Sequence, residues 1–538
     1  GLNRNQRRNI IMKGYCKGQI IEMARALFRE ERARDRLDGW FYAREAAMGV
    51  EGTFSPEKKA ALALRQMVTE LPIDLSLNAV FAGIQRDAFA RTYALINPAF
   101  QVETFSGYCD PTSVFDDIEP QGELTRERID VLRKKTNDSA YVRELMRVYD
   151  DFGNYTSEVV FFVEQVTGHV IPDFREVLRY GVKALISNIK ARLAQTQDEE
   201  RRSNFQAMAD SLECVLLLAG RYASLARKQM EEAEENRRLQ LELMIETLER
   251  VPAYGARNLY EAIQSFMLLW QVMCLEQAPN PFAFSVGNAD RIFEPYRAMT
   301  DMSREEAAEL LSCLLVFYNV GDRSWAISQN LLIGGRDVNG KDLTNLTSYA
   351  LLDAYYEMML PQPILSVKLH HNTPDGLYRE LGRFFFTPGM LTPSLFNDET
   401  VFEVLSCGSV ESADLADYAV AGCQEPLIMG KDNGNTTNSW LNMGKVLELV
   451  LNNGNSMITG EKLMEVDVPS DPKELLENLR PLFYAALESA AEAMAEAANG
   501  ATAALSNLRV PFLSAFMGGA ETGYDMRDTG NQGTKYNG

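Results

Sequence analysis

Cys423 and Glu425 are the two side chains in this sequence whose types and spacing could do chemistry. They belong to the stretch GCQEP at 422–426, which follows an apolar run at 418–421 and precedes a glycine-rich polar loop at 430–438. This order predicts a strand that opens into a turn. Side chains two positions apart on an extended chain point the same way, about 6–7 Å apart. Cys423 and Glu425 should therefore face one cavity, with room for a small substrate between them.

The chemistry of this pair depends on how the thiol reacts. A cysteine beside apolar residues is most often a small buried hydrophobe. An ionic mechanism finds little support, because no His or Lys stands near Cys423 in the sequence to stabilise a thiolate. A thiol that reacts as a radical exchanges a hydrogen atom and needs no such partner. Glu425 would then move a proton on the group next to a substrate radical.

The composition argues against several other classes of function. The 538 residues carry 75 acidic and 54 basic side chains, a net charge of −21, which would repel a nucleic-acid backbone. The longest apolar runs, at 214–219 and 310–318, are shorter than the roughly 20 residues that cross a bilayer. Residues 1–30 lack the apolar core of a secretory signal. We expect a cytoplasmic protein with neither a nucleic-acid nor a membrane partner.

Cysteines and histidines are too few and too dispersed for the common metal and hydrolytic sites. The seven cysteines are odd in number and widely spread, which argues against a disulfide framework and CxxC metal sites. Two of the three histidines are adjacent, so no zinc triad or Ser-His-Asp arrangement is evident. The remaining one, His169, lies between glycine and β-branched residues and is typical of a hydrogen-bonded structural histidine. We expect no bound metal.

Helices and buried strands must position the Cys423 loop. Short β-rich runs such as 331–333 and 364–369 appear after 325, separated by turn residues and helices. The alanine-rich stretch 485–504 predicts a helix that packs closely on a neighbour. Apolar positions at three- and four-residue spacing predict amphipathic helices over 17–50, 124–151, 172–249, 256–277 and 302–318. These patterns indicate an α/β fold in one continuous domain over 1–538, mainly helical to 325 and β/α from 326.

Four ordered segments give the sequence a resemblance to a known family. GCQEP at 422–426 is similar to the active-site loop of glycyl radical enzymes, in the diol dehydratase and lyase branch of the pyruvate formate-lyase-like family. TGHVIPDF at 167–174, PQPILSV at 361–367 and PSLFNDE at 393–399 resemble further segments of that family. The resemblance covers about residues 150–538.

The resemblance implies a fold, a mechanism and partners. The fold is a roughly ten-stranded α/β barrel, with the cysteine loop at its centre and helices outside. In this family a glycyl radical near the C-terminus takes a hydrogen atom from the loop cysteine, which takes one from the substrate. Carried over, Cys423 is the thiyl radical residue and Glu425 the general base or acid. The implied partners are a small-molecule substrate, a radical S-adenosylmethionine activating enzyme with an iron–sulfur cluster, and a second copy in a homodimer.

The radical glycine is expected outside the given residues. The family's radical loop carries an Arg-Val-x-Gly-Tyr type of motif, and this string does not occur in the 538 residues. We therefore expect these residues to be an incomplete catalytic domain with no bound cofactor, and the post-translational glycyl radical to lie in a C-terminal domain beyond them.

The sequence departs from the family's diol-handling members around the pocket. Where those carry His and Ser, this sequence has Phe282 and Ala283, and Thr437 stands where they have Asp. An apolar wall argues against glycerol or propanediol, since buried polar substrate groups need partners. Gly422 stands where pyruvate formate-lyase has a second cysteine, which argues against pyruvate. The predicted substrate-binding residues are Phe282, Thr436, Thr437 and Asn438.

The favoured function is that of an anaerobic glycyl radical lyase, which eliminates water or another leaving group from a small organic substrate. The apolar wall also fits an arylacetate-type substrate, so a glycyl radical decarboxylase is the alternative. A carboxylate substrate would need a cationic clamp, and the loop 426–440 offers only Lys431 as a cation, which favours elimination. A further alternative is an inactive homologue or scaffold fragment, because the radical motif is missing.

Overall fold

The computed structural model groups the chain into two units, each with its own internal contacts. It describes residues 12–32, 38–83, 115, 120, 122–163, 167–277, 283–321, 329–390, 392–434, 439–528, 530 and 533–537. Unit 1 comprises Gly1–Ala94, Thr167–Asn435 and Arg509–Gly538, and unit 2 comprises Leu95–Val166 and Thr436–Leu508. Because the chain passes repeatedly from one unit to the other, the existence of one continuous domain stays a prediction.

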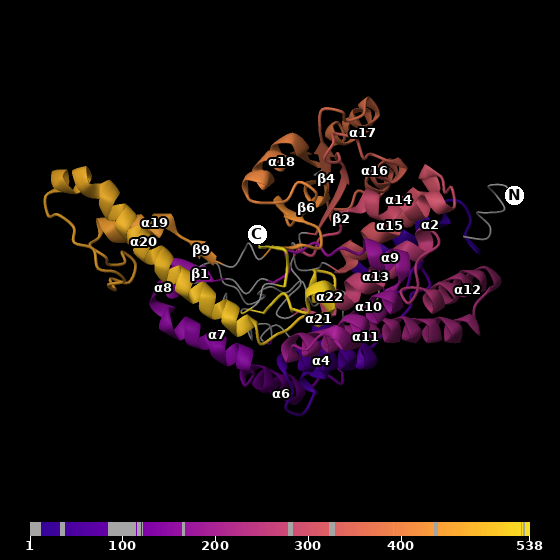
Figure 1. Cartoon of the computed structure of the whole chain (residues 1–538), viewed down its shortest axis with the longest axis horizontal. Helices are drawn as coiled ribbons and strands as arrows, with labels where there is room; N and C mark the ends of the chain where they lie inside the picture. The colour runs from indigo at the N-terminus through magenta and orange to yellow at the C-terminus, as the bar shows by residue number, and fades with distance from the viewer. Residues whose placement is uncertain are drawn as a thin grey trace. The chain divides into compact units, whose positions relative to one another are not determined.

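Long helices form one side of unit 1. Helix α11 (Glu199–Met230) is capped by Asp198, whose side chain accepts a hydrogen bond from the backbone N–H of Arg201. It packs against α4 (Pro56–Glu70), α10 (Val182–Gln195) and α12 (Glu235–Arg250) (Figure 1). Every residue of α13 (Leu259–Glu276) is buried. A helix that is buried all round belongs to the centre of a large core.

A four-stranded parallel sheet lies beside these helices in unit 1. Its strands follow chain order: β2 (Gly287–Asn288), β3 (Asn330–Gly334), β4 (Ile364–Leu369) and β5 (Ser394–Asn397). The helices between the strands are α14 (Ala289–Met299), α15 (Arg304–Gly321), α16 (Leu346–Met358) and α17 (Asp375–Phe385) (Figure 1). All of β3 is buried, as expected for a strand covered on both faces. The alternation of strands and helices confirms the predicted α/β class.

Unit 2 is built around two antiparallel short strands and a long alanine-rich helix. Strand β1 (Phe161–Val163) pairs with β9 (Ser439–Leu441). Helix α20 (Pro472–Leu505) lies against α7 (Ala140–Asp151), where a Cβ at Gly500 would stand 2.8 Å from Val148. The small residues of α20 therefore permit the close helix packing that the sequence predicted. The remaining elements of this unit are α6 (Arg126–Asn137), α8 (Gly153–Ser157) and α19 (Met443–Leu451).

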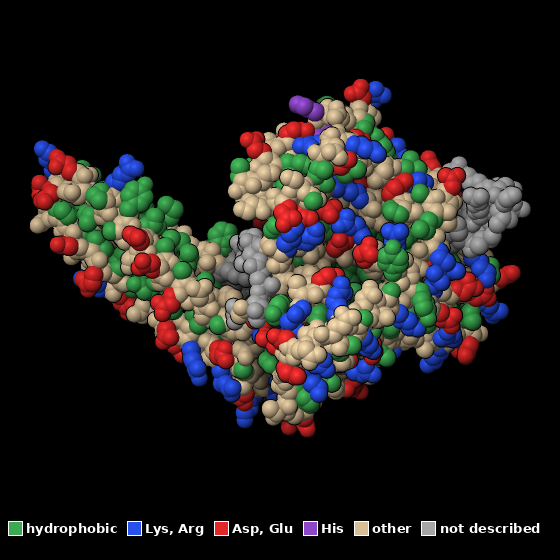
Figure 2. Space-filling model, in the orientation of Figure 1, with side chains coloured by type: hydrophobic (Ala, Val, Ile, Leu, Met, Phe, Trp, Pro, Cys, Tyr) green, Lys and Arg blue, Asp and Glu red, His purple; other side chains and the backbone are tan. Residues whose placement is uncertain are grey.

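Helix α19 is apolar on both sides. Val446, Leu449 and Val450 enter the core of unit 2. Met443, Leu447 and Leu451 recur every four residues, so they share the other face of the helix and are exposed there. Figure 2 shows hydrophobic side chains gathered over α19 and α20.

The predicted helices are confirmed, with boundaries that the sequence pattern did not resolve. Positions 17–50 form α2 (Gln19–Arg32) and α3 (Asp38–Met48). Positions 172–249 form α9 (Arg175–Tyr180) and then α10, α11 and α12. The break after α9 falls at Gly181, whose φ of 87° takes the chain out of the helix. Among the described residues no helix is long and apolar enough to cross a bilayer.

Truncation of Phe266 should test the core that supports the sheet. Its buried ring packs edge-on against Phe174 and Phe293, with centroids 5.3 and 5.5 Å away. We expect Phe266→Ala to lower the free energy of unfolding by about 3–5 kcal/mol in urea denaturation, because the cavity remains partly unfilled. The control Met299→Ala removes an exposed side chain of α14 and should cost less than about 0.5 kcal/mol. Equal losses in the two variants would contradict this picture of the core.

Candidate active site

Cys423 lies at the tip of a β-hairpin in unit 1. Strand β6 (Tyr418–Ala421) pairs antiparallel with β7 (Glu425–Ile428), and the last pair is Ala421 with Glu425. Residues 422–424 therefore form the turn, and Cys423 is exposed at its tip. The predicted strand opening into a turn is confirmed. The predicted extended geometry at Cys423 is wrong, because Gly422 has a φ of 57° and bends the chain before the cysteine.

The carboxylate of Glu425 folds back over this turn. Its Oε2 accepts a hydrogen bond from the backbone N–H of Gln424 at 3.0 Å. The same oxygen would lie 2.8 Å from a Cβ added at Gly422. The carboxylate is thus fixed close to the backbone that carries Cys423, while its side chain stays partly exposed. A half-buried acid held at the cysteine turn is placed to exchange a proton with a molecule bound there.

His169 lies beside Glu425, although the sequence gave it a structural role. Its Nε2 would stand 3.0 Å from a Cβ at Gly422, so the imidazole and the carboxylate crowd the same point of the turn. The side chain is buried and its backbone has a φ of 48°, a strained conformation for a non-glycine residue. Burial lowers the pKa of His169 below its usual value, and the nearby Glu425 carboxylate partly opposes this shift. Burial therefore favours the neutral ring, which has one donor and one acceptor nitrogen.

Backbone hydrogen bonds join the segment that carries His169 to the residues just after the hairpin and to those just before β2. The N–H of Gly430 donates to the carbonyl of Ile171 at 2.7 Å, and the N–H of Ser285 donates to that of Val170 at 3.1 Å. A Cβ at Gly434 would stand 2.2 Å from the carbonyl oxygen of His169. Glycine at 434 thus lets the loop after the hairpin pass directly over His169.

The predicted substrate-binding residues lie outside the part of the chain that the structure describes. They are Phe282, Thr436, Thr437 and Asn438. Ala283, at the predicted apolar wall, is buried with a φ of 56°. The sequence reasoning gave His169 a structural role and did not place it near Glu425, because the two residues lie far apart along the chain. The signal that could have found it is its position inside TGHVIPDF, one of the segments that carried the family resemblance.

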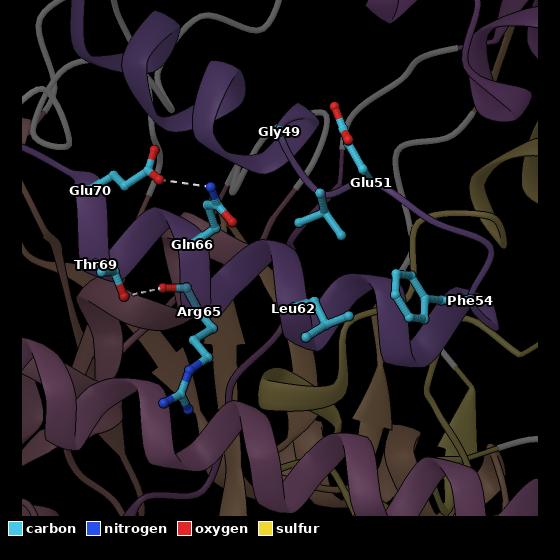
Figure 3. Close-up of a pocket in the computed structure, with 9 residues that line it drawn as sticks. Gly49, Glu51, Phe54, Leu62, Arg65, Gln66, Thr69 and Glu70 are labelled. Atoms are coloured by element: carbon cyan, nitrogen blue, oxygen red, sulfur yellow. Dashed lines mark hydrogen bonds between the residues drawn. The ribbon is translucent and has the colours of Figure 1, made fainter.

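A separate surface cavity of about 410 Å³ lies along α4 (Figure 3). Gln66 donates to Glu70 at 2.7 Å and Thr69 donates to the carbonyl of Arg65 at 2.7 Å, so these polar groups bond within the helix itself. The cavity is lined by Gly49, Val50, Glu51, Phe54, Leu62, Arg65, Gln66, Thr69 and Glu70. None of these residues belongs to the cysteine hairpin. Within the described residues, no group of three or more His, Cys, Asp or Glu side chains is arranged to hold a metal ion.

The chain belongs to the pyruvate formate lyase-like family, which it matches over residues 11–538. The family resemblance expected from the four sequence segments is therefore confirmed. A structure solved in work on 1,2-propanediol dehydration in Roseburia inulinivorans superimposes with a TM-score of 0.81 at 21% identity. The match covers 97% of this chain and 68% of that one, so the two share the fold.

Two curated relatives show the range of chemistry among similar proteins. An isethionate sulfite-lyase of Desulfovibrio desulfuricans is 26% identical over 329 residues, covering 56% of this chain and 39% of that protein. An indoleacetate decarboxylase of Tractidigestivibacter scatoligenes is 30% identical over 332 residues, covering 57% of this chain and 37% of that protein. The chain thus spans less than half of the length of these relatives.

The buried neutral His169 should make stability depend on pH. Its folded-state pKa lies below the ordinary value of 6.5, so on acidification the unfolded chain takes up the proton first. Stability contributed by the neutral ring is complete above pH 6.5 and is lost as the pH falls below it. The loss is about 1.4 kcal/mol for each pH unit between the two pKa values.

Thermal melts between about pH 5 and pH 8 measure this effect. The midpoint of the wild-type protein should fall on acidification by more than that of His169→Asn, which keeps a polar side chain but does not titrate. Melting curves that shift in parallel for the two proteins would show that His169 does not carry the effect.

Proposed function

We propose that the protein is a glycyl radical lyase that eliminates a leaving group from a small, hydroxyl-bearing substrate. The observation that carries the proposal is the cysteine turn. The exposed Cys423 directly follows Gly422, and the Glu425 carboxylate and the His169 imidazole both lie close to that glycine. A sulfur with an acid–base pair at its side meets the needs of radical elimination. Burial lowers the pKa of His169, which disfavours the imidazolium that an ionic cysteine nucleophile would pair with.

Each of the three groups has a defined task in this proposal. A glycyl radical, installed by an S-adenosylmethionine-dependent activating enzyme, would supply the acceptor for the Cys423 hydrogen atom. The Cys423 sulfur then takes a hydrogen atom from the substrate carbon that bears the hydroxyl. Glu425 removes the hydroxyl proton, so that a C=O bond forms and the leaving group departs from the neighbouring carbon. His169 would donate a hydrogen bond from its ring to the departing group. The Cys423 thiol finally returns its hydrogen atom to the product radical, which completes the product and regenerates the thiyl radical.

The similar proteins support elimination as the reaction class. One relative is named for the release of sulfite, and the structural neighbour comes from work on the dehydration of a diol. These reactions differ in the group that leaves, which depends on the substrate pocket. The proposal assigns the same roles to Cys423 and Glu425 whichever group leaves.

Decarboxylation is the second candidate, because the indoleacetate decarboxylase is 30% identical to this chain. An acetate-type substrate would need a cation to hold its carboxylate. Lys431, the cation that the loop after the hairpin offers, forms an ion pair with Asp414, and Asp414 also contacts Lys535 at 2.7 Å. Lys431 is thus already engaged by an acid in unit 1. This engagement favours elimination over decarboxylation.

An anaerobic assay of the full-length protein, activated by its activating enzyme, tests the proposal. We expect a carbonyl product from diols, amino alcohols, sulfonates or hydroxylated amino acids. Cys423→Ala should reduce turnover to background, and Glu425→Gln should lower kcat by about 10²–10⁴ because general base catalysis is lost. The control Cys407→Ala removes another exposed cysteine, at the end of α18 (Asp398–Cys407), and should keep full turnover.

Three outcomes would overturn the proposal in different ways. Turnover retained in Cys423→Ala would exclude the cysteine as the reacting group. Carbon dioxide released from an arylacetate, without carbonyl product from any hydroxylated substrate, would favour the decarboxylase. A full glycyl radical signal in electron paramagnetic resonance, with no turnover of either substrate class, would favour a scaffold or binding role.

A further inference from the structure

Strand β6 carries the cysteine turn, yet it does not join the parallel sheet by strand pairing. Among the described strands its backbone partner is β7. The carbonyl groups of Tyr418 and Gly422, at the start of β6 and just after its end, accept hydrogen bonds from buried side chains instead. Buried carbonyl groups without partners are costly, so these side chains satisfy a need that a neighbouring strand would otherwise meet.

The first contact holds the end of the strand next to the cysteine. Nδ2 of Asn330, the first residue of β3, donates to the carbonyl oxygen of Gly422 at 3.0 Å. Asn330 is fully buried, and its own backbone N–H donates to Oγ of Ser285 at 3.1 Å. The peptide bond that precedes Cys423 is therefore tied directly to the sheet.

The second contact holds the start of the strand. Nζ of Lys368, on β4, donates to the carbonyl oxygen of Tyr418 at 2.8 Å and to Oδ1 of Asn288 at 3.1 Å. Nδ2 of Asn288, on β2, donates to the same Tyr418 carbonyl at 3.1 Å. The Lys368 nitrogen also stands 3.9 Å from the centroid of the Tyr418 ring. The Tyr418 hydroxyl donates to Oδ1 of Asp398 at 2.5 Å, which fixes the side chain as well.

All three donors come from one face of the parallel sheet. In the sheet register Asn288 on β2, Leu332 on β3 and Ser366 on β4 stand opposite one another. Asn330 lies two residues before Leu332 on β3, and Lys368 lies two residues after Ser366 on β4. Residues two apart on a strand share a face, so Asn288, Asn330 and Lys368 point the same way. Each is at most 1% exposed. A buried lysine is costly, and its retention under β6 is accounted for by the bonds that it makes there.

We propose that Asn330 and Lys368 are positioning residues, which hold the two ends of β6 and thereby fix where the Cys423 sulfur stands. The proposal rests on the proposed function in so far as Cys423 is the reacting group. Hydrogen-atom transfer requires the two reacting atoms at contact distance, and a misplacement of about 1 Å costs on the order of 100-fold in rate. Among the described residues, three side chains hold the backbone of β6 to the sheet, so we expect the loss of a single donor to move the Cys423 sulfur.

Two variants remove one donor each and keep the side-chain bulk: Asn330→Leu and Lys368→Met. Ser366→Ala is the matched control, because Ser366 is fully buried on the same sheet face and its Oγ makes no hydrogen bond within the described part of the chain. Leu352→Ala, in the buried face of α16, is the control for a general loss of stability.

The first measurement requires no turnover. In the full-length protein, the rate of Cys423 alkylation by iodoacetamide is compared with those of Cys16 and Cys407, two other exposed thiols in the same molecule. Asn330→Leu and Lys368→Met should change the rate at Cys423 at least threefold relative to these reference thiols. Hydrogen exchange should rise in the peptide that covers 418–428. Ser366→Ala should change neither, and Leu352→Ala should raise exchange around α16 without altering the Cys423 ratio.

The second measurement is turnover of the activated enzyme, with its radical content checked by electron paramagnetic resonance. We expect kcat to fall about 10- to 100-fold in both variants, with KM and radical content unchanged, because substrate contacts are retained. An unaltered Cys423 alkylation ratio, or the same pattern in Leu352→Ala, would overturn the proposal. Unchanged kcat together with a locally loosened hairpin would overturn it as well. An inactive wild-type enzyme would contradict the proposed function, while the alkylation and exchange results would still decide whether the two residues fix the sulfur.

Discussion

The need to satisfy the buried backbone of β6 is the constraint on which the rest of the site depends. A strand has two edges, and in the described structure the hairpin partner β7 occupies one of them. The carbonyl groups of Tyr418 and Gly422 remain inside the protein and have to find donors elsewhere. Their donors are side chains of β2, β3 and β4. The sheet therefore supports the turn through side chains, and its strands are free to pair with one another.

Buried charges near the ends of β3 and β4 extend this support to the surrounding helices. Asp290, at the start of α14, accepts from the N–H of Gly334 at 2.7 Å and from the hydroxyl of Ser348 on α16 at 2.6 Å. Burial raises the pKa of Asp290 and lowers that of Lys368, since both charged forms lose hydration. Such groups add little net stability but bond to specific partners. Asp290 joins α14 to β3 and α16, and Lys368 joins β4 to β6, so these bonds fix the sheet in the position from which it holds the hairpin.

The sequence predicted those features that local patterns determine. Helix periodicity identified α11, because amphipathic spacing acts within a few turns. It also located α13, but the predicted amphipathic character of that helix is wrong, because every one of its residues is buried. It also placed a turn at Cys423, because an apolar run ends there before polar and glycine residues. It did not predict the conformation of the turn, because the rule for residues two apart assumes an extended chain and Gly422 is left-handed. Nor did it place His169 near Glu425, because the two side chains meet at Gly422 only through the fold, which leaves no trace in their spacing along the chain.

The signature GCQEP can be understood as a set of physical requirements on one turn. Glycine is favoured at 422 because φ is positive, and because a Cβ there would displace the Glu425 carboxylate and press on His169. Cysteine at 423 lies at the tip of the turn, where it is exposed. Glutamate at 425 accepts the N–H of Gln424 and thereby stays over the turn. Proline at 426 stands opposite Val420 in the hairpin, and its fixed φ restrains the strand just after the acid. The residues of the motif thus meet steric or hydrogen-bonding requirements that keep the Cys423 sulfur and the Glu425 carboxylate at one turn.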